Sequence, residues 1–290
     1  MNLDLDEYID NLRQGNLLSI ESISKVCEVA SEILAKEPNV LQISPPVTIC
    51  SNIHGQFEDL LEIFRVGGEI PLTKYIFLGS NINFGRKSVE VMELLLCLKV
   101  KYPEHIYLLR GNHETEEISR VFGFYTELKT KYANIKLWKN FVKNIFPNFP
   151  LAAIIDKKIF CLYGGLSPKT LSIDEIQAID RKAEKDPLLD ILWSNPEEIE
   201  GWEPNSRGIG YSFGSNVVKK FNQKNGFELI VRGSQPVESG YRYSYKDKNL
   251  VTVWSVPNFK GSLDNFGAIL VIDEDLNREM KILTSTFIRY

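Results

Sequence analysis

Strand-like and helix-like patterns alternate three times between residues 46 and 132, and this alternation restricts the fold more than any other feature. Each short β-rich run is followed by a longer helical pattern: 46–50 by 56–66, 75–79 by 87–102, and 105–112 by 114–132. This order predicts a largely parallel sheet with polar loops at the carboxyl ends of its strands. A functional site in this half of the chain is therefore expected along that edge.

A helix is also predicted ahead of these strands, and a second sheet after them. Residues 20–36 place apolar side chains at helical spacing, with Ser19 as the expected N-cap. The later β-rich runs, which predict a mixed sheet packed on the first, are 151–156, 158–165, 227–233, 250–257 and 267–274. No linker or repeat is visible, so residues 1–290 are predicted to form a single domain, with 1–40 as a helical segment packed on it.

Composition and charge narrow the class of protein. The chain has 290 residues, a formal net charge of −4 and 4 cysteines without a C-x-x-C pair. An acidic balance argues against a nucleic-acid partner, and no apolar run approaches the length of a membrane span. Cysteines that are far apart, most of them within apolar runs, predict buried free thiols in a reducing compartment. We therefore expect a cytoplasmic protein, with the nucleus as a second location.

Six polar clusters follow strand-like runs or lie in later loops. They are "SNIHGQ" (51–56), "GSNINFGRKSVE" (79–90), "LRGNHE" (109–114), "YGGLSP" (163–168), "SRGIGYSFG" (206–214) and "VRGSQ" (231–235). In the first, Asn52 and His54 have the spacing at which many hydrolases place two metal ligands, although the first ligand is normally a carboxylate. His54 is therefore either a metal ligand or a packed histidine bonded to a backbone carbonyl.

Together these clusters resemble the metal-dependent serine/threonine protein phosphatases of the phosphoprotein phosphatase family, closest to the type 2A-like catalytic subunits. The resemblance covers nearly the whole chain and includes connecting stretches such as "VFGFYTELKTKYAN" and "IFCLYGGLSP". It implies an α/β calcineurin-like metallophosphoesterase fold, with two mixed β-sheets in a central sandwich flanked by helices. It also implies a reaction in which two metal ions clamp a phosphate and activate a water molecule.

The family's metal-ligand positions fall on six residues of this chain: Asn52, His54, Ser80, Asn112, Tyr163 and Ser234. Only His54 and Asn112 match the family. Asn52 and Ser80 stand where the family has aspartates, and the last two residues of the list stand where it has histidines. Ser80 occupies the position of the carboxylate that bridges both metals, and a neutral hydroxyl cannot hold two divalent cations together.

Tight metal binding is therefore not expected. The vestigial metal positions, which we expect to be unoccupied, are Asn52, His54 and Asn112. The lost ligand positions are Ser80, Tyr163 and Ser234. We expect no cofactor or, failing that, one weakly bound divalent metal (Mn, Fe or Zn). The motif "RGNHE" then has two interpretations: it supplies a ligand and a general acid, or it caps and shapes the following helix.

The positions that handle phosphate and protons in the family are also altered. Arg207 matches one phosphate-gripping arginine, while the other is replaced by Phe84. His113 matches the general acid, but its carboxylate partner is replaced by Asn83. The resemblance thus implies a vestigial phosphate-binding residue and a vestigial acid. Arg207 is either a surviving anion site or half of an ion pair, and Phe84 and Tyr163 are expected to fill the vacated pocket.

These losses lead us to expect a catalytically inactive homologue, a pseudophosphatase that acts by binding proteins. The resemblance implies scaffold or regulatory subunits of type 2A-like phosphatases, or phosphoproteins, as partners; neither nucleic acid nor a membrane is expected. The alternative is an enzyme: a residual or remodelled metal-dependent serine/threonine phosphoprotein phosphatase, which hydrolyses phosphoric monoesters. This enzyme would work either with one metal or as a hydrolase that uses His113, His54 and Arg207.

Overall fold

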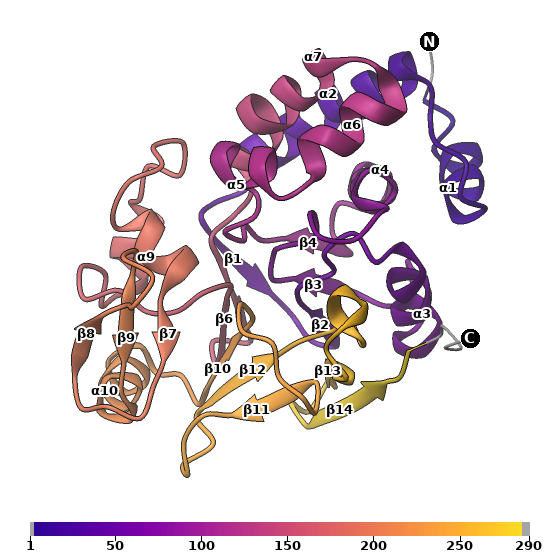
Figure 1. Cartoon of the computed structure of the whole chain (residues 1–290). Coiled ribbons are helices and arrows are strands. Elements are labelled where there is room, and N and C mark those ends of the chain that lie inside the picture. The colour runs from indigo at the N-terminus through magenta and orange to yellow at the C-terminus, as the bar shows by residue number, and fades with distance from the viewer. Residues whose placement is uncertain (1–2, 286–290) are drawn as a thin grey trace.

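Two large β-sheets pack face to face at the centre of the molecule (Figure 1). The computed structural model describes residues 3–285. One sheet has five strands, in the order β14 (Arg278–Leu283), β13 (Gly267–Ile272), β2 (Val47–Cys50), β3 (Tyr75–Phe77) and β4 (Ile106–Leu108). The other has six, in the order β1 (Val40–Ile43), β5 (Ala152–Ile155), β6 (Ile159–Leu162), β10 (Leu229–Arg232), β12 (Leu250–Val253) and β11 (Tyr241–Tyr243). Both sheets are mixed, as expected.

The pairing of β2, β3 and β4 sets the position of the candidate site. These strands are parallel, with Ile49 opposite Ile76 and Tyr75 opposite Ile106. Their carboxyl ends therefore meet at one edge, as the alternating pattern predicts. The expectation that the run 267–274 joins the second sheet is wrong, because β13 lies antiparallel to β2 in the first. Its residues are almost all buried, which suits a central strand of either sheet, so the apolar pattern did not determine the partner.

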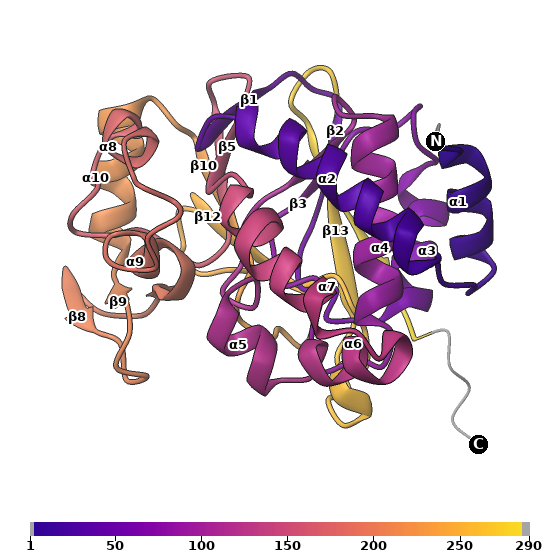
Figure 2. The ribbon, with the colours of Figure 1, turned by 90° about the horizontal axis from the view of Figure 1, so that it is seen from above.

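Helices cover the outer surfaces of the sandwich (Figures 1 and 2). Those in the first half of the chain are α1 (Leu5–Arg13), α2 (Ile20–Lys36), α3 (Phe57–Gly67), α4 (Ser88–Lys101), α5 (Glu116–Val121), α6 (Phe124–Tyr132) and α7 (Ile135–Asn140). Helix α2 has the predicted bounds, and Ser19 caps it by accepting a hydrogen bond from the Ser22 amide. The helix predicted over 114–132 is instead two helices, because Gly123 between them has a φ of +128°, which a helix cannot contain.

The N-terminal helices pack on α4 to form the largest apolar cluster. Leu12 of α1, Ile23 of α2 and Leu95 of α4 all belong to it and are fully buried. Burying a side chain of this size stabilises the fold by about 1.5–3 kcal/mol. Helix α4 is consequently covered on almost all sides.

The second half of the chain contains more helix than its sequence pattern indicates. Helices α8 (Ile173–Gln177), α9 (Leu188–Trp193) and α10 (Ser215–Asn225) group with a small sheet at one end of the molecule (Figures 1 and 2). That sheet has the order β7 (Asn195–Pro196), β9 (Tyr211–Phe213) and β8 (Trp202–Pro204). Across residues 3–285, no helix has the length and apolar character needed to cross a membrane.

Candidate functional site

The loops that follow β2, β3 and β4 interlock at the carboxyl edge of the first sheet. The backbone amide of Asn52 donates to Gly79 O at 3.0 Å, and the amide of His54 donates to Ser80 O at 3.0 Å. Asn52, His54 and Ser80 all have φ near +50°, the left-handed region that residues with a side chain seldom adopt. These backbone bonds bring the first two sequence clusters together, as the edge argument predicts.

Glu114 ties the third loop to the second. Its buried carboxylate accepts hydrogen bonds from the amides of Ser80 (2.8 Å), Asn81 (2.8 Å) and Gly111 (3.0 Å). Burial raises the pKa of this carboxyl, and the backbone donors oppose that rise. The loop also needs glycine at 111, because a Cβ there would lie 2.3 Å from Ser80 N. "RGNHE" therefore joins two loops, and Glu114 does not cap α5, which begins at Glu116.

Tyr163, at the end of β6, fills the space beneath these loops. It is 2% exposed, and its hydroxyl donates to Asn52 Oδ1 at 2.9 Å. Asn52 Nδ2 in turn donates to Ser51 Oγ at 2.7 Å, and Ser80 Oγ donates to Asn112 Oδ1 at 3.1 Å. Burial raises the pKa of Tyr163, so the side chain stays a neutral phenol. Four of the six ligand positions are thus hydrogen-bonded to one another or to a neighbouring side chain.

Asn83 fixes the tautomer of His113. The amide of Asn83 is oriented by two backbone groups, since its Oδ1 accepts from Phe124 N at 2.9 Å and its Nδ2 donates to Ile118 O at 3.3 Å. The same Nδ2 lies 2.8 Å from His113 Nδ1, which must therefore accept. The remaining proton of a neutral His113 ring is on Nε2. Burial lowers the pKa of His113 well below its ordinary value, so the ring is neutral at pH 7.

His54 lies in a cage of aromatic rings. Its Nδ1 donates to Ile82 O at 3.1 Å, which leaves the lone pair on Nε2. Burial lowers the pKa of His54 to about 3, and the charge of Lys260 acts in the same direction. The distances from its ring centroid to those of the surrounding rings are 4.8 Å to His113, 5.0 Å to Phe259, 5.2 Å to Phe84 and 5.5 Å to Trp254. Phe84, at the position of the second family arginine, is therefore part of a closed aromatic cluster.

Arg207 lies at the margin of this arrangement, whereas Ser234 follows β10 and lies close to Tyr163. The exposed Arg207 stacks on Trp193, with 5.1 Å from its guanidinium carbon to the ring centroid, and donates to Trp193 O at 2.7 Å. It forms no ion pair within residues 3–285, so the ion-pair interpretation is wrong. The Ser234 hydroxyl is buried and has no hydrogen-bond partner that meets normal geometry among the described residues.

The donor set does not fit a pair of divalent ions. None of the six ligand positions carries a carboxylate, and residues 3–285 contain no group of three or more His, Cys, Asp or Glu that could hold a metal ion. Glu114, the nearby acid, has both oxygens occupied by backbone amides. Two adjacent divalent ions repel each other and need anionic ligands between them. We therefore derive no chemical step through metal at this site.

The sequence did not identify two cations in this region: Arg232, which is buried, and Lys260, which lies beside the Phe84 ring. Arg232 is fully buried and donates to Gly164 O at 2.6 Å and Asn195 Oδ1 at 2.7 Å, while burial lowers its pKa to about 9. Lys260 lies with its ammonium 3.8 Å from the centroid of the Phe84 ring. The sequence signal for Lys260 is only its place beside Phe259 in "VPNFKG", which does not reveal a contact with residue 84.

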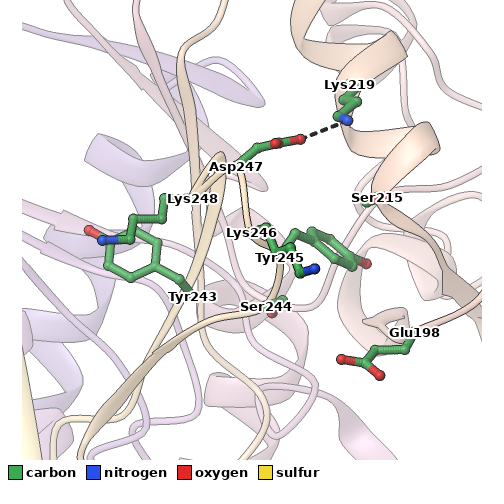
Figure 3. A pocket seen from close by; sticks show the side chains of 9 residues that line it. All are labelled: Glu198, Ser215, Lys219, Tyr243, Ser244, Tyr245, Lys246, Asp247 and Lys248. Atoms are coloured by element: carbon green, nitrogen blue, oxygen red, sulfur yellow. Dashed lines mark ion pairs between the residues drawn. The ribbon is translucent and has the colours of Figure 1, made fainter.

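A separate hollow lies away from these loops, between α10 and the β11–β12 hairpin (Figure 3). Its volume is about 570 Å³, and none of its lining residues belongs to the six ligand positions. An ion pair between Lys219 and Asp247 crosses it at 2.7 Å (Figure 3). The nearby Lys248 lies over Tyr243, 5.8 Å from the ring centroid.

Comparison with known proteins decides the family. A family model for calcineurin-like phosphoesterases matches residues 45–237. The chain belongs to the calcineurin-like phosphoesterases. Its serine/threonine-protein phosphatase relative ppe1 of Schizosaccharomyces pombe is 45% identical over 285 residues, which cover 97% of this chain and 93% of the relative. The resemblance to the serine/threonine phosphatases is therefore confirmed.

Solved structures agree on the calcineurin-like phosphoesterase fold. A protein serine/threonine phosphatase from Saccharomyces cerevisiae, similar to human phosphatase PP5, superposes with a TM-score of 0.90 at 26% identity, covering 100% of this chain and 98% of that one. The cold-active protein-tyrosine phosphatase of a Shewanella species has a TM-score of 0.61 at 18% identity, with 86% and 84% of the two chains covered, and shows the fold alone. The expected α/β metallophosphoesterase fold with two mixed sheets is confirmed.

The expectation of a catalytically inactive binding protein is wrong. A relative that is 45% identical over 97% of the chain is a serine/threonine-protein phosphatase, and this likeness favours the alternative of a phosphatase. The expectation failed because it equated the loss of metal ligands with the loss of the reaction. The donor set tests metal binding, whereas turnover depends on every group that contacts the phosphate.

Proposed function

We propose that this chain is a remodelled serine/threonine phosphoprotein phosphatase, which binds phosphoserine or phosphothreonine segments and hydrolyses the phosphate ester. The observation that carries the proposal is the 45% identity to a serine/threonine-protein phosphatase across 97% of the chain. The retained residues His54, Asn112, His113 and Arg207 occupy positions where the family places its ligands, acid and phosphate-binding arginine.

His113 is the proposed proton donor to the leaving oxygen: as water adds to phosphorus and the ester P–O bond breaks, Nε2–H protonates the serine or threonine oxygen, and the proton that the water releases restores the ring. Its Nε2 carries the proton because Asn83 donates to Nδ1, so the ring presents one N–H without needing a second proton. A neutral imidazole is a weaker acid than an imidazolium, and an amide partner does not raise its basicity as a carboxylate would. The proposal therefore includes turnover that is slow for this family.

The aromatic cluster controls access to His113. His113 is 8% exposed, and its ring contacts Phe84 (5.1 Å between centroids) and Phe122 (5.8 Å). Phe84 is half-buried and Phe122 is exposed, so these two rings form the outer wall that a phosphorylated side chain must displace.

Several finer expectations belong to this proposal. We propose that the chain is a single domain with residues 1–40 packed on it, and that no pair of metal ions is resident. Phosphoproteins are the proposed partners, and binding to scaffold or regulatory subunits of type 2A-like phosphatases stays a prediction. A location in the cytoplasm or nucleus also stays a prediction.

The test is phosphate release from phosphoserine and phosphothreonine peptides by the purified chain. We expect release that saturates with peptide concentration and is the same in EDTA and in Mn²⁺, because the donor set does not fit the ions. Asn83→Asp should raise the rate, because a carboxylate beside His113 Nδ1 raises the basicity of the ring. If phosphate is released neither in EDTA nor in Mn²⁺, the proposal is overturned.

A further inference from the structure

A solvent-open hollow adjoins the aromatic cage of His54. Its volume is about 610 Å³, and it lies between the start of α3, the loop after β3 and the loop after β12. Gln56, Phe84, Arg86, Asn258 and Lys260 are among its lining residues. Phe84 belongs to both spaces, because its ring lines the hollow and lies 5.2 Å from that of His54. The hollow is therefore the outer face of the candidate site.

Two exposed cations point to an anionic ligand in this hollow. Lys260 lies with its ammonium 3.8 Å from the Phe84 ring centroid and 5.2 Å from that of Phe259. Arg86 lies two positions along the chain from Phe84. Within residues 3–285 neither cation forms an ion pair with a carboxylate. Two unpaired cations on one concave surface raise the local concentration of anions.

Two carboxylates near the start of α3, Asp59 and Glu58, are bonded to other groups and not to these cations. Asp59 lines it but is 4% exposed, and its Oδ2 accepts from Gln56 Nε2 at 2.6 Å. Glu58 pairs with Lys87 on the neighbouring surface. The positive charge of the rim is therefore available to a ligand.

One wall of the hollow is formed where the start of α3 meets the loop after β12. Asn258 Oδ1 is buried and has no hydrogen-bond partner among the described residues. Gln56, which donates to Pro257 O at 3.0 Å, holds the start of α3 against the loop that carries Asn258.

We propose that Lys260 and Arg86 bind the phosphate of a phosphoserine or phosphothreonine segment at the outer face of the candidate site. Lys260 comes from the loop after β12 and Arg86 from the loop after β3, so the two cations reach the hollow from different segments of the chain. The inference rests on the proposed function for its ligand class, but it concerns binding and does not require hydrolysis.

The experiment measures binding of a fluorescent phosphoserine peptide by anisotropy in EDTA. Lys260→Met and Arg86→Met remove one charge each from exposed side chains, and we expect each to weaken binding by about tenfold. Lys260→Arg keeps the charge and should bind within about twofold of the wild-type chain. The matched control is Lys248→Met, which removes another exposed lysine lying over an aromatic ring, in the separate hollow of Figure 3, and should change nothing.

Competition identifies the ligand. We expect the phosphoserine peptide to bind more tightly than its unphosphorylated form, because only the phosphate can pair with Lys260 and Arg86, and we expect inorganic phosphate to compete with it. If Lys260→Met and Arg86→Met bind the peptide as the wild-type chain does, the inference is overturned. Equal affinity for the phosphorylated and unphosphorylated peptides overturns it as well.

Binding and hydrolysis are measured in different assays, so failure of this inference can be distinguished from failure of the proposed function. Binding that depends on Lys260, without phosphate release, supports this inference and overturns the proposed phosphatase function. Phosphate release with an unchanged KM in Lys260→Met supports the proposed phosphatase function and overturns this inference.

Discussion

Replacing Tyr163 by phenylalanine tests how the centre of the candidate site is held together. The change removes one hydroxyl and leaves Asn52 Oδ1, which accepts from it at 2.9 Å, buried without a donor. An unsatisfied buried polar atom costs about 1–3 kcal/mol. We therefore expect Tyr163→Phe to lower the free energy of unfolding by about 2 kcal/mol.

The melting temperature gives a direct measurement of this loss. With an unfolding entropy of about 2.1 cal/mol/K per residue, a chain of 290 residues loses about 3 °C for 2 kcal/mol. Tyr243→Phe is the matched control, since the Tyr243 hydroxyl has no hydrogen-bond partner within residues 3–285, and it should change the stability by less than about 0.5 kcal/mol. If Tyr163→Phe is as stable as this control, the hydrogen-bonded description of the site is refuted.

Three further predictions concern metal, pH and the acid. Adding EDTA should leave the melting temperature of the wild-type chain unchanged, whereas removing an ion present at 100 times its Kd would lower the stability by about 2.7 kcal/mol. Glu93 of α4 is fully buried and accepts hydrogen bonds from Leu18 N and the Tyr132 hydroxyl. Burial raises its pKa to about 7, so the stability that the protonated carboxyl contributes is fully present below pH 4.5 and is lost as the pH rises through 7. Glu93→Gln cannot ionise at this position. Between pH 5 and 8 its free energy of unfolding, measured in urea, should therefore change by about 2–3 kcal/mol less than that of the wild-type chain. The same pH dependence in both proteins would contradict this. His113→Gln should reduce phosphate release by about 100-fold, and an unchanged rate would exclude His113 as the acid.

The sequence predicts the parts of the fold that depend on local pattern. Helix α2 begins and ends at the predicted residues because its apolar spacing and its Ser19 cap are both local features. The parallel order of β2, β3 and β4 follows from the alternating pattern. The partner of β13 does not, because a buried strand has the same apolar sequence in either sheet.

The candidate site was also predictable only where its residues lie within one local motif. The residues at the ligand positions could be identified because each lies within a short motif. The bond from Tyr163 to Asn52 and the position of Lys260 over Phe84 could not, because each joins segments that only the packing of the two sheets brings together. The motifs also misled: they describe how the chain would hold metal, and from that alone the sequence suggested the loss of a reaction that the comparison with a phosphatase supports.

The central claim is that a remodelled site still hydrolyses phosphoprotein esters. Its most direct test is kcat/KM for phosphate release from a phosphoserine peptide, measured in EDTA for the wild-type chain, His113→Gln and the Lys248→Met control. The account predicts release by the wild-type chain and the control, and a loss of about 100-fold in His113→Gln. Equal rates for all three proteins, or no release by any of them, would contradict it.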